Sequence, residues 1–121
     1  MRAIAPNYWQ DGIRVNAICP GIVKTNLVNP EGWAAFPSHL FIAPETIAAA
    51  VQTLIHPGTD GLVDARGKFI PARQAYGLAV EISGDKLYFR EPVGFCDDGM
   101  RDIMSATEVE NQDQAAGVQD G

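Results

Sequence analysis

Residues 12–27 read GIRVNAICPGIVKTNL and contain the clearest strand signal in the chain. Residues 13–19 are rich in β-branched and small side chains, are apolar on both alternating faces, and are closed by Pro20-Gly21. This pattern is typical of a strand covered on both sides by helices, as in a parallel sheet. It predicts that Cys19 is a small buried residue and that Asn16 makes structural hydrogen bonds.

A helix is predicted over residues 44–56. Pro44 and Glu45 suit the first helical turn, and His56-Pro57-Gly58 ends the pattern. Apolar residues recur on one face of this helix, at Ile47, Ala50, Val51, Leu54 and Ile55. A second strand is predicted over residues 76–82. Because a strand, a helix and a strand follow one another, we expect one parallel βαβ unit and an α/β fold.

The segments between these elements are less regular. Residues 2–10 are expected to end a helix, and residues 26–43 to form a long loop that can hold a short helix. That loop either binds a ligand or packs against the body. An irregular stretch is expected over 57–75. Its three basic residues, Arg66, Lys68 and Arg73, could bind a phosphate, but a solvated loop is the favoured interpretation. Further predictions are a turn at 83–86, an extended segment at 87–90, and a short helix within 97–106.

The negative charge is concentrated at the C-terminal end. Of the 121 residues, 1–96 hold eight acidic and eight basic side chains, whereas 97–121 hold seven acidic side chains and only Arg101 as a base. This distribution argues against nucleic acid or an anionic membrane surface as a partner, because both require a basic face. From Thr107 onward the composition predicts disorder.

Composition also limits the classes of site and the location. The two cysteines, Cys19 and Cys96, cannot form a disulfide framework or a four-ligand zinc site alone, and His39 and His56 have no partner at metal-ligand spacing. No metal site is therefore predicted. No apolar run approaches the ~18 residues of a membrane span, and no signal peptide is evident, so a cytoplasmic location is expected.

The sequence resembles the short-chain dehydrogenase/reductase family. The resemblance rests on the sixteen consecutive positions 12–27, followed by a loop, a helix beginning at Pro44-Glu45 and a strand ending at Ser83-Gly84. It implies a partial Rossmann-like, doubly wound fold with one C-terminal βαβ unit. By this resemblance, residues 1–94 form a C-terminal part of an NAD(P)-binding domain. Residues 95–121 then form an acidic tail, with a short helix followed by disorder.

Members of this family use NAD or NADP to oxidise alcohols or reduce carbonyl groups of small molecules. The resemblance therefore implies four cofactor-binding residues: Pro20, Gly21, Ile22 and Thr25. Backbone around the first three would approach the nicotinamide carboxamide, and the Thr25 hydroxyl would bind the carboxamide or the pyrophosphate. The same resemblance places Trp33, Phe36 and Leu40 in a loop that covers the substrate.

Two motifs of the family do not occur in the sequence. There is no Gly-x-x-x-Gly-x-Gly turn, and the fourth residue after Tyr8, Tyr76 and Tyr88 is Gly12, Val80 and Pro92, so no Tyr-x-x-x-Lys pair exists. No catalytic residue is therefore assigned. We expect the chain alone to be inactive and to bind a dinucleotide weakly.

An alternative interpretation is a non-catalytic partner or regulatory fragment that associates with an intact member of the family. A homo- or hetero-oligomer would then form through the helix at 44–56 and the strand at 76–82. An independent small enzyme is the least favoured hypothesis, since no carboxylate or histidine spacing suggests a site of its own.

Overall fold

The computed structural model describes residues 1–108 and 110–112. The chain divides into two compact units, Met1–Arg90 and Glu91–Gly121, and each is described by itself. The first unit contains α1 (Ala5–Gln10), β1 (Ala17–Pro20), α2 (Pro30–Trp33), η1 (Ser38–Leu40), α3 (Pro44–Ile55), β2 (Leu62–Val63), β3 (Phe69–Ile70), η2 (Ala72–Gln74), β4 (Ala79–Ser83) and β5 (Lys86–Arg90). The second unit contains α4 (Asp98–Ala106).

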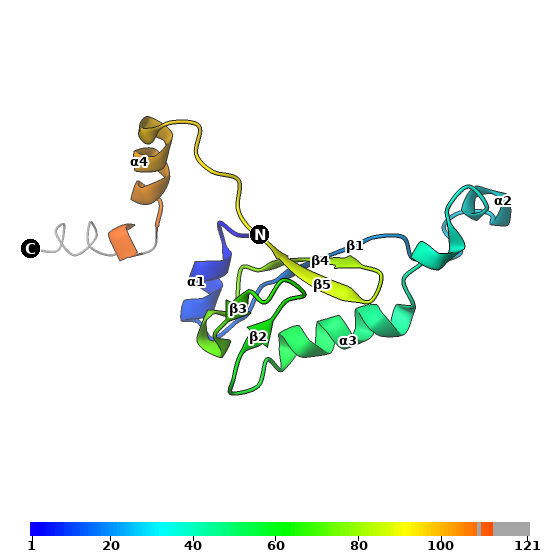
Figure 1. Ribbon diagram of the computed structural model, residues 1–121. Helices are drawn as coiled ribbons and strands as arrows, with labels where there is room; N and C mark the ends of the chain where they lie inside the picture. The colour runs from blue at the N-terminus through cyan, green and yellow to red at the C-terminus, as the bar shows by residue number, and fades with distance from the viewer. Residues whose placement is uncertain (109, 113–121) are drawn as a thin grey trace, which may run out of the picture. The chain divides into compact units, whose positions relative to one another are not determined.

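A three-stranded sheet with the order β1-β4-β5 lies at the centre of the first unit (Figure 1). β1 runs parallel to β4, with Ala17 opposite Ala79, and β5 pairs antiparallel with β4. The predicted parallel strand–helix–strand unit is confirmed, with both strands shifted toward the C-terminus. This mixed α/β sheet fits a part of a Rossmann-like fold.

The turn between β4 and β5 has two central residues, Gly84 and Asp85. Gly84 has a φ of 60°, which the first central position of a type II′ hairpin turn requires and which glycine adopts without steric cost. The predicted turn at 83–86 and the extended segment after it are therefore confirmed.

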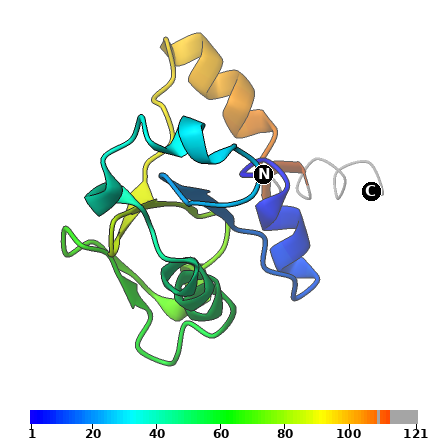
Figure 2. The same ribbon diagram turned by 90° about the vertical axis from the view of Figure 1, so that its right-hand side faces the viewer.

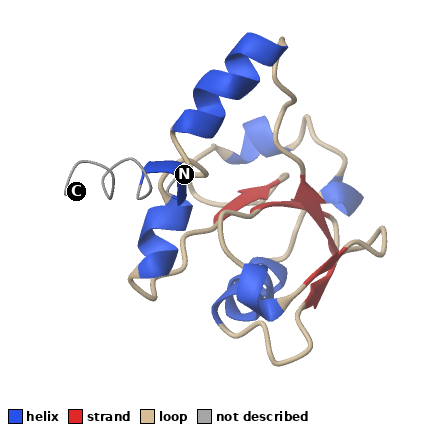
Figure 3. Cartoon of the chain, turned by 90° about the vertical axis from the view of Figure 1, so that its left-hand side faces the viewer, coloured by secondary structure: helices blue, strands red, loops and turns tan. Residues whose placement is uncertain are grey.

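Helix α3 lies along one side of the strands, as Figures 2 and 3 show from opposite directions. Pro44 occupies the start of the helix and Glu45 its first turn, as predicted. Two groups of buried side chains join α3 to the sheet and its connections: Leu54, Leu62, Ala75, Val80 and Phe89 in one, and Ile42, Ala50 and Ile82 in the other. Ile47, Ala50 and Leu54 of the predicted apolar face therefore pack, whereas Ile55 at the end of that face is 57% exposed.

The prediction that the first strand is covered on both sides was wrong in part. Cys19 is exposed rather than buried, and Ile13 is 48% exposed and precedes the strand. The reason is the position of β1, which pairs only with β4 among the described strands. Ala17 and Ile18 are half-buried whereas Cys19 and Pro20 are exposed, so shielding weakens toward the carboxyl end of this strand.

The long loop over 26–43 contains the short helix that was anticipated, α2, and the 3-10 turn η1. Residues 57–75 are more ordered than predicted, because they form the antiparallel β2–β3 hairpin and η2. Strands of two residues are too short to produce a hydrophobic period. This explains why the sequence did not indicate them.

The second unit confirms the helix predicted within 97–106. Asp97 caps α4, because its side-chain oxygen accepts a hydrogen bond from the backbone N–H of Met100 at 2.7 Å. The predicted disorder from Thr107 falls largely on residues 109 and 113–121, which lie outside the described residues. No helix in the described ranges combines the length and hydropathy needed to cross a membrane.

Candidate functional site

The four residues assigned to cofactor binding lie at the carboxyl end of β1 and in the turn after it. Pro20 ends the strand, and the Gly21 N–H donates to the Ile82 carbonyl oxygen of β4 at 2.9 Å. The Ile22 carbonyl then accepts from the Ile42 N–H at 2.7 Å. These bonds fix the turn between β1 and the segment that leads into α3. Carboxyl ends of parallel strands are where open α/β sheets bind ligands.

Gly21 is the tightest position of this turn. A Cβ built on it would lie 3.3 Å from both the Ile42 Cδ1 atom and the Ile82 carbonyl oxygen. A side chain here would require Ile42 or the backbone at Ile82 to shift by a small amount. Because the residue itself is exposed, its missing side chain leaves the backbone open to a ligand.

Thr25 lies further along the turn and is exposed. Its hydroxyl oxygen accepts a hydrogen bond from the Leu27 N–H at 3.2 Å, and its carbonyl oxygen accepts one from the Trp33 indole Nε1–H at 3.0 Å. Since the hydroxyl only accepts in this arrangement, its own hydrogen can still be donated to a ligand carbonyl or phosphate oxygen.

A cavity of about 330 Å³ borders Thr25. It is lined by Lys24, Thr25, Asn26, Val28, Asn29, Pro30 and Trp33. The ammonium, hydroxyl and amide groups of this lining can bind an amide or an anionic group. Of the three residues placed in a substrate-covering loop, Trp33 lines this cavity, whereas Phe36 and Leu40 do not.

The aromatic residues of the loop form a cluster of their own. The Trp33 ring lies edge-on to Phe41, with 5.7 Å between ring centroids, and is tilted against Phe36 at 6.2 Å. The loop is therefore packed on itself at Trp33, while Phe36 and Leu40 remain exposed. The bond from Trp33 to Thr25 was not predicted, because the spacing of residues in the sequence does not show that the loop folds back onto Thr25.

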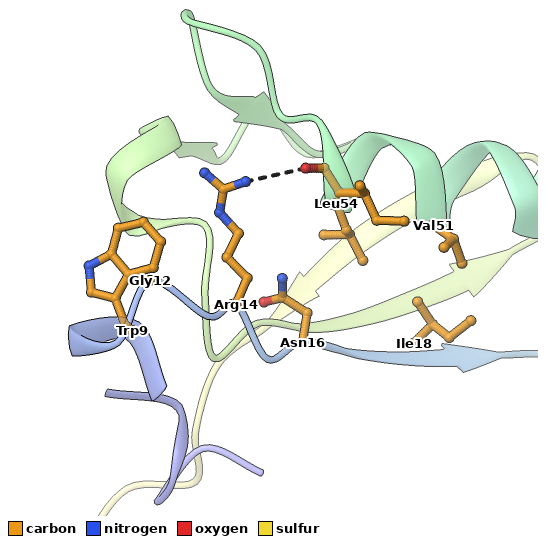
Figure 4. Close-up of a pocket in the computed structure, with 8 residues that line it drawn as sticks. Trp9, Gly12, Arg14, Asn16, Ile18, Val51 and Leu54 are labelled. Carbon is orange, nitrogen blue, oxygen red and sulfur yellow. Dashed lines mark hydrogen bonds between the residues drawn. The ribbon is translucent and has the colours of Figure 1, made fainter. Parts of the chain in front are cut away.

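A larger cavity, about 700 Å³, lies toward the amino end of β1 (Figure 4). It is lined by Trp9, Gly12, Arg14, Asn16, Ile18, Val51, Leu54 and Ile55. The Arg14 and Asn16 side chains of this lining already have partners. The Arg14 guanidinium donates to the Ile55 carbonyl at 3.3 Å and lies 5.5 Å from the centre of the Trp9 ring.

Asn16, in the same cavity, has the structural role predicted for it. Its amide donates to the Ala75 carbonyl at 3.3 Å and accepts from the Leu78 N–H at 3.0 Å. The larger cavity also lies away from the carboxyl ends of the strands. The Pro20–Thr25 turn is therefore the better candidate for cofactor binding.

The loop carrying Arg66 contains a buried carboxylate that the sequence did not reveal. Asp64 accepts hydrogen bonds from the backbone N–H groups of Arg66, Lys68 and Phe89 at 2.9, 2.9 and 3.1 Å. Burial of the Asp64 carboxyl raises its pKa, but these three bonds and the Arg66 guanidinium together hold the pKa below its usual value.

The Arg66 side chain is 51% exposed, and its guanidinium also contacts the rest of the unit. Its guanidinium donates to the Phe89 carbonyl at 2.7 Å, lies 3.4 Å from the Asp64 carboxylate, and sits 5.8 Å from the Tyr88 ring centre. The pair joins the β2–β3 loop to β5, so its role is structural. The Asp64-x-x-Gly67 spacing indicates a local turn, but it does not show that the carboxylate is buried against Phe89.

Within 1–108 and 110–112, no group of three or more His, Cys, Asp or Glu side chains could hold a metal ion.

Comparison with known proteins identifies two relatives. The short-chain dehydrogenase/reductase prx7 of Penicillium rubens is 52% identical over 115 residues, which are 93% of this chain and 41% of that protein. The meso-2,3-butanediol dehydrogenase of Serratia marcescens is 50% identical over 32 residues, which are 26% of this chain and 12% of that enzyme. No family profile and no solved structure matches the chain.

The chain thus spans about two fifths of the length of the Penicillium relative. Identity at this level extends over nearly all of the chain, well beyond the sixteen residues that first suggested the resemblance. The chain belongs to the short-chain dehydrogenase/reductase family and represents a C-terminal part of such a protein.

Proposed function

We propose that this chain is part of an NAD(P)-dependent oxidoreductase and contributes the Pro20–Thr25 turn to the cofactor site. One observation carries the proposal: an exposed turn with a close-packed glycine and a Thr25 hydroxyl follows the carboxyl end of a parallel strand. The names of both relatives, a short-chain dehydrogenase/reductase and a butanediol dehydrogenase, support the same class of reaction.

In this proposal the cofactor supplies the hydride chemistry and the chain positions it. The backbone of Pro20, Gly21 and Ile22 would lie against the nicotinamide carboxamide, and the missing side chain at Gly21 leaves room for this approach. The Thr25 hydroxyl would donate to the carboxamide or the pyrophosphate. The substrate would be a small-molecule alcohol or carbonyl compound; the choice between NAD and NADP stays open, and a cytoplasmic location stays a prediction.

A chimera tests the cofactor role. We would replace the 115 matched residues of the Penicillium relative by those of this chain, and measure NADH and NADPH binding by isothermal titration calorimetry. We expect binding close to that of the parent protein, and Gly21→Val to weaken it at least tenfold, because the new side chain meets Ile42 and the Ile82 carbonyl. Gly94→Val is the matched control, since nothing lies within 4 Å of a Cβ at Gly94. Equal binding by both variants would contradict the proposed role of the turn.

The chain by itself is proposed to be inactive, since its sequence holds neither the glycine-rich turn nor a Tyr-x-x-x-Lys pair. A spectrophotometric assay with NADH and NADPH and a panel of ketones and alcohols should give no turnover above background. Measurable turnover would show that another proton donor replaces the missing tyrosine.

The alternative function, a non-catalytic partner of an intact family member, would use α3 and the strand region 76–82. β4 lies between β1 and β5, so both of its edges are already paired, and a partner could reach it only through a face or through its neighbours. Sedimentation of the chain with and without an intact reductase tests this function. A monodisperse monomer in both samples would exclude it.

A further inference from the structure

Trp33 connects the substrate-side loop to the proposed cofactor turn. Its indole Nε1–H donates to the carbonyl oxygen of Thr25, eight residues earlier, at 3.0 Å. The backbone between these two residues therefore forms a closed loop, and residues of this loop, together with Lys24, line the 330 Å³ cavity. A tryptophan has one side-chain donor, and here that donor is used on the backbone of a residue proposed to contact the cofactor.

The closed loop is held by local contacts that fix the position of Trp33. Asn29 caps α2, because its side-chain oxygen accepts from the Gly32 N–H at 2.9 Å. A Cβ on Gly32 would lie 2.4 Å from the Val28 Cγ1 atom, so a larger residue here would require the Val28 side chain to move. The indole is thus presented by a short, capped helix.

The other side of the Trp33 ring reaches the second anchor of the cofactor turn. The ring lies edge-on to Phe41, and the next residue, Ile42, donates its N–H to the Ile22 carbonyl at 2.7 Å. Trp33 is therefore connected to both bonds that hold residues 22–25: it makes the bond to Thr25 itself, and its ring contacts Phe41, the residue before the donor to Ile22.

We propose that Trp33 is a positioning residue for the cofactor. By holding the Thr25 carbonyl, the indole orients the Thr25 hydroxyl toward the nicotinamide or pyrophosphate, and it links closure of the loop to cofactor binding. This inference rests on the proposed function, because it assigns to Trp33 an effect on the same site. It makes the indole N–H a direct reporter of whether the cofactor turn is formed.

The test is an NMR titration of the full 121-residue chain with NADH, which detects weak binding and also shows whether each variant is folded. Wild type is compared with Trp33→Phe, which keeps an aromatic ring beside Phe41 but removes the donor. The matched control is Trp9→Phe, which removes the other indole of the chain, on α1. The hydrogen-exchange rate of the Trp33 indole N–H is measured first, without NADH.

We expect the Trp33 indole N–H to exchange more slowly than a free indole. NADH should shift the amide signals of residues 21–25 and the Trp33 indole together. Loss of one hydrogen bond should weaken NADH binding about 2- to 10-fold in Trp33→Phe, with smaller shifts at Thr25, while Trp9→Phe binds as wild type does.

Two failures are distinguishable. If NADH shifts residues 21–25 equally in wild type and Trp33→Phe, or if the indole exchanges as a free one, the positioning role is overturned while the proposed function stands. If NADH shifts no signal in wild type, the proposed cofactor turn is overturned, and the inference with it.

Discussion

Asp64 is the charged residue most completely enclosed among the described residues, with 6% of its surface exposed. Both carboxylate oxygens accept backbone N–H donors. An asparagine amide in its place would have to turn its NH₂ group toward at least one of them. We therefore expect Asp64→Asn to lower the melting temperature by several degrees, measured by circular dichroism. Asp60→Asn, at an exposed position of the loop before β2, is the control, and equal melting of the two variants would contradict this role.

The pH dependence follows from the same carboxylate. Although burial raises the pKa of Asp64, the N–H donors of Lys68, Phe89 and Arg66 and the Arg66 guanidinium hold it below its usual value. Its pKa is thus lower in the folded than in the unfolded chain, whose ordinary value is about 3.9. The stabilisation is fully present above that value and is lost as the pH falls through the folded pKa.

We therefore expect the free energy of unfolding to decrease below about pH 4, and this decrease to be smaller in Asp64→Asn. Urea unfolding followed from neutral pH into the acid range measures both. An identical pH profile for wild type and variant would mean that other carboxylates cause the acid sensitivity.

At the level of elements, we expect α3 to stabilise the fold mainly through the side chains on its buried face. Leu54 is buried against Leu62, Val80 and Phe89, whereas the adjacent Ile55 is 57% exposed. Leu54→Ala should lower the free energy of unfolding by about 2–5 kcal/mol because it leaves a cavity in the core. Ile55→Ala should change it by only about 0.5 kcal/mol. Urea unfolding distinguishes them, and similar losses would show that α3 packs differently.

The elements that the sequence predicted well have a long or chemically specific signal. The helix over 44–56 ends one residue earlier in the structure, since five apolar positions and a proline define it. The two-residue strands β2 and β3 have no such signal and were missed. Cys19 was misjudged because the strand pattern assumes neighbours on both sides, and β1 has one among the described strands.

The features of the candidate site also differ in how far they could be predicted from the sequence. The cofactor role of Pro20, Gly21, Ile22 and Thr25 was inferred from the family resemblance and stays a prediction; the structure places these residues at and after the carboxyl end of β1. The bond from Trp33 to Thr25 and the carboxylate of Asp64 bonded to Phe89 could not be predicted, because each depends on a loop returning to a distant part of the chain. These contacts are set by tertiary packing, and the conformational preferences of neighbouring residues do not reveal them.

For the whole molecule, the buried hydrophobic residues and the net negative charge lie on opposite sides of Arg90 in the sequence. Within the described ranges, every buried hydrophobic residue lies in 1–90, and α4 contains none. Residues 1–90 hold seven acidic and eight basic side chains, so all of the net negative charge comes from the remainder of the sequence.

A chain ending at Arg90 should therefore melt at the temperature of the full chain, but aggregate more readily, since a net charge near zero promotes association. A chain ending at Ser83 is the control, because loss of β5 removes Phe89 from the core and should abolish the cooperative transition. Circular dichroism melts at low protein concentration, with light scattering in parallel, separate folding from solubility. If the chain ending at Arg90 melted several degrees lower without scattering, the acidic segment would have to contribute packing and not only charge.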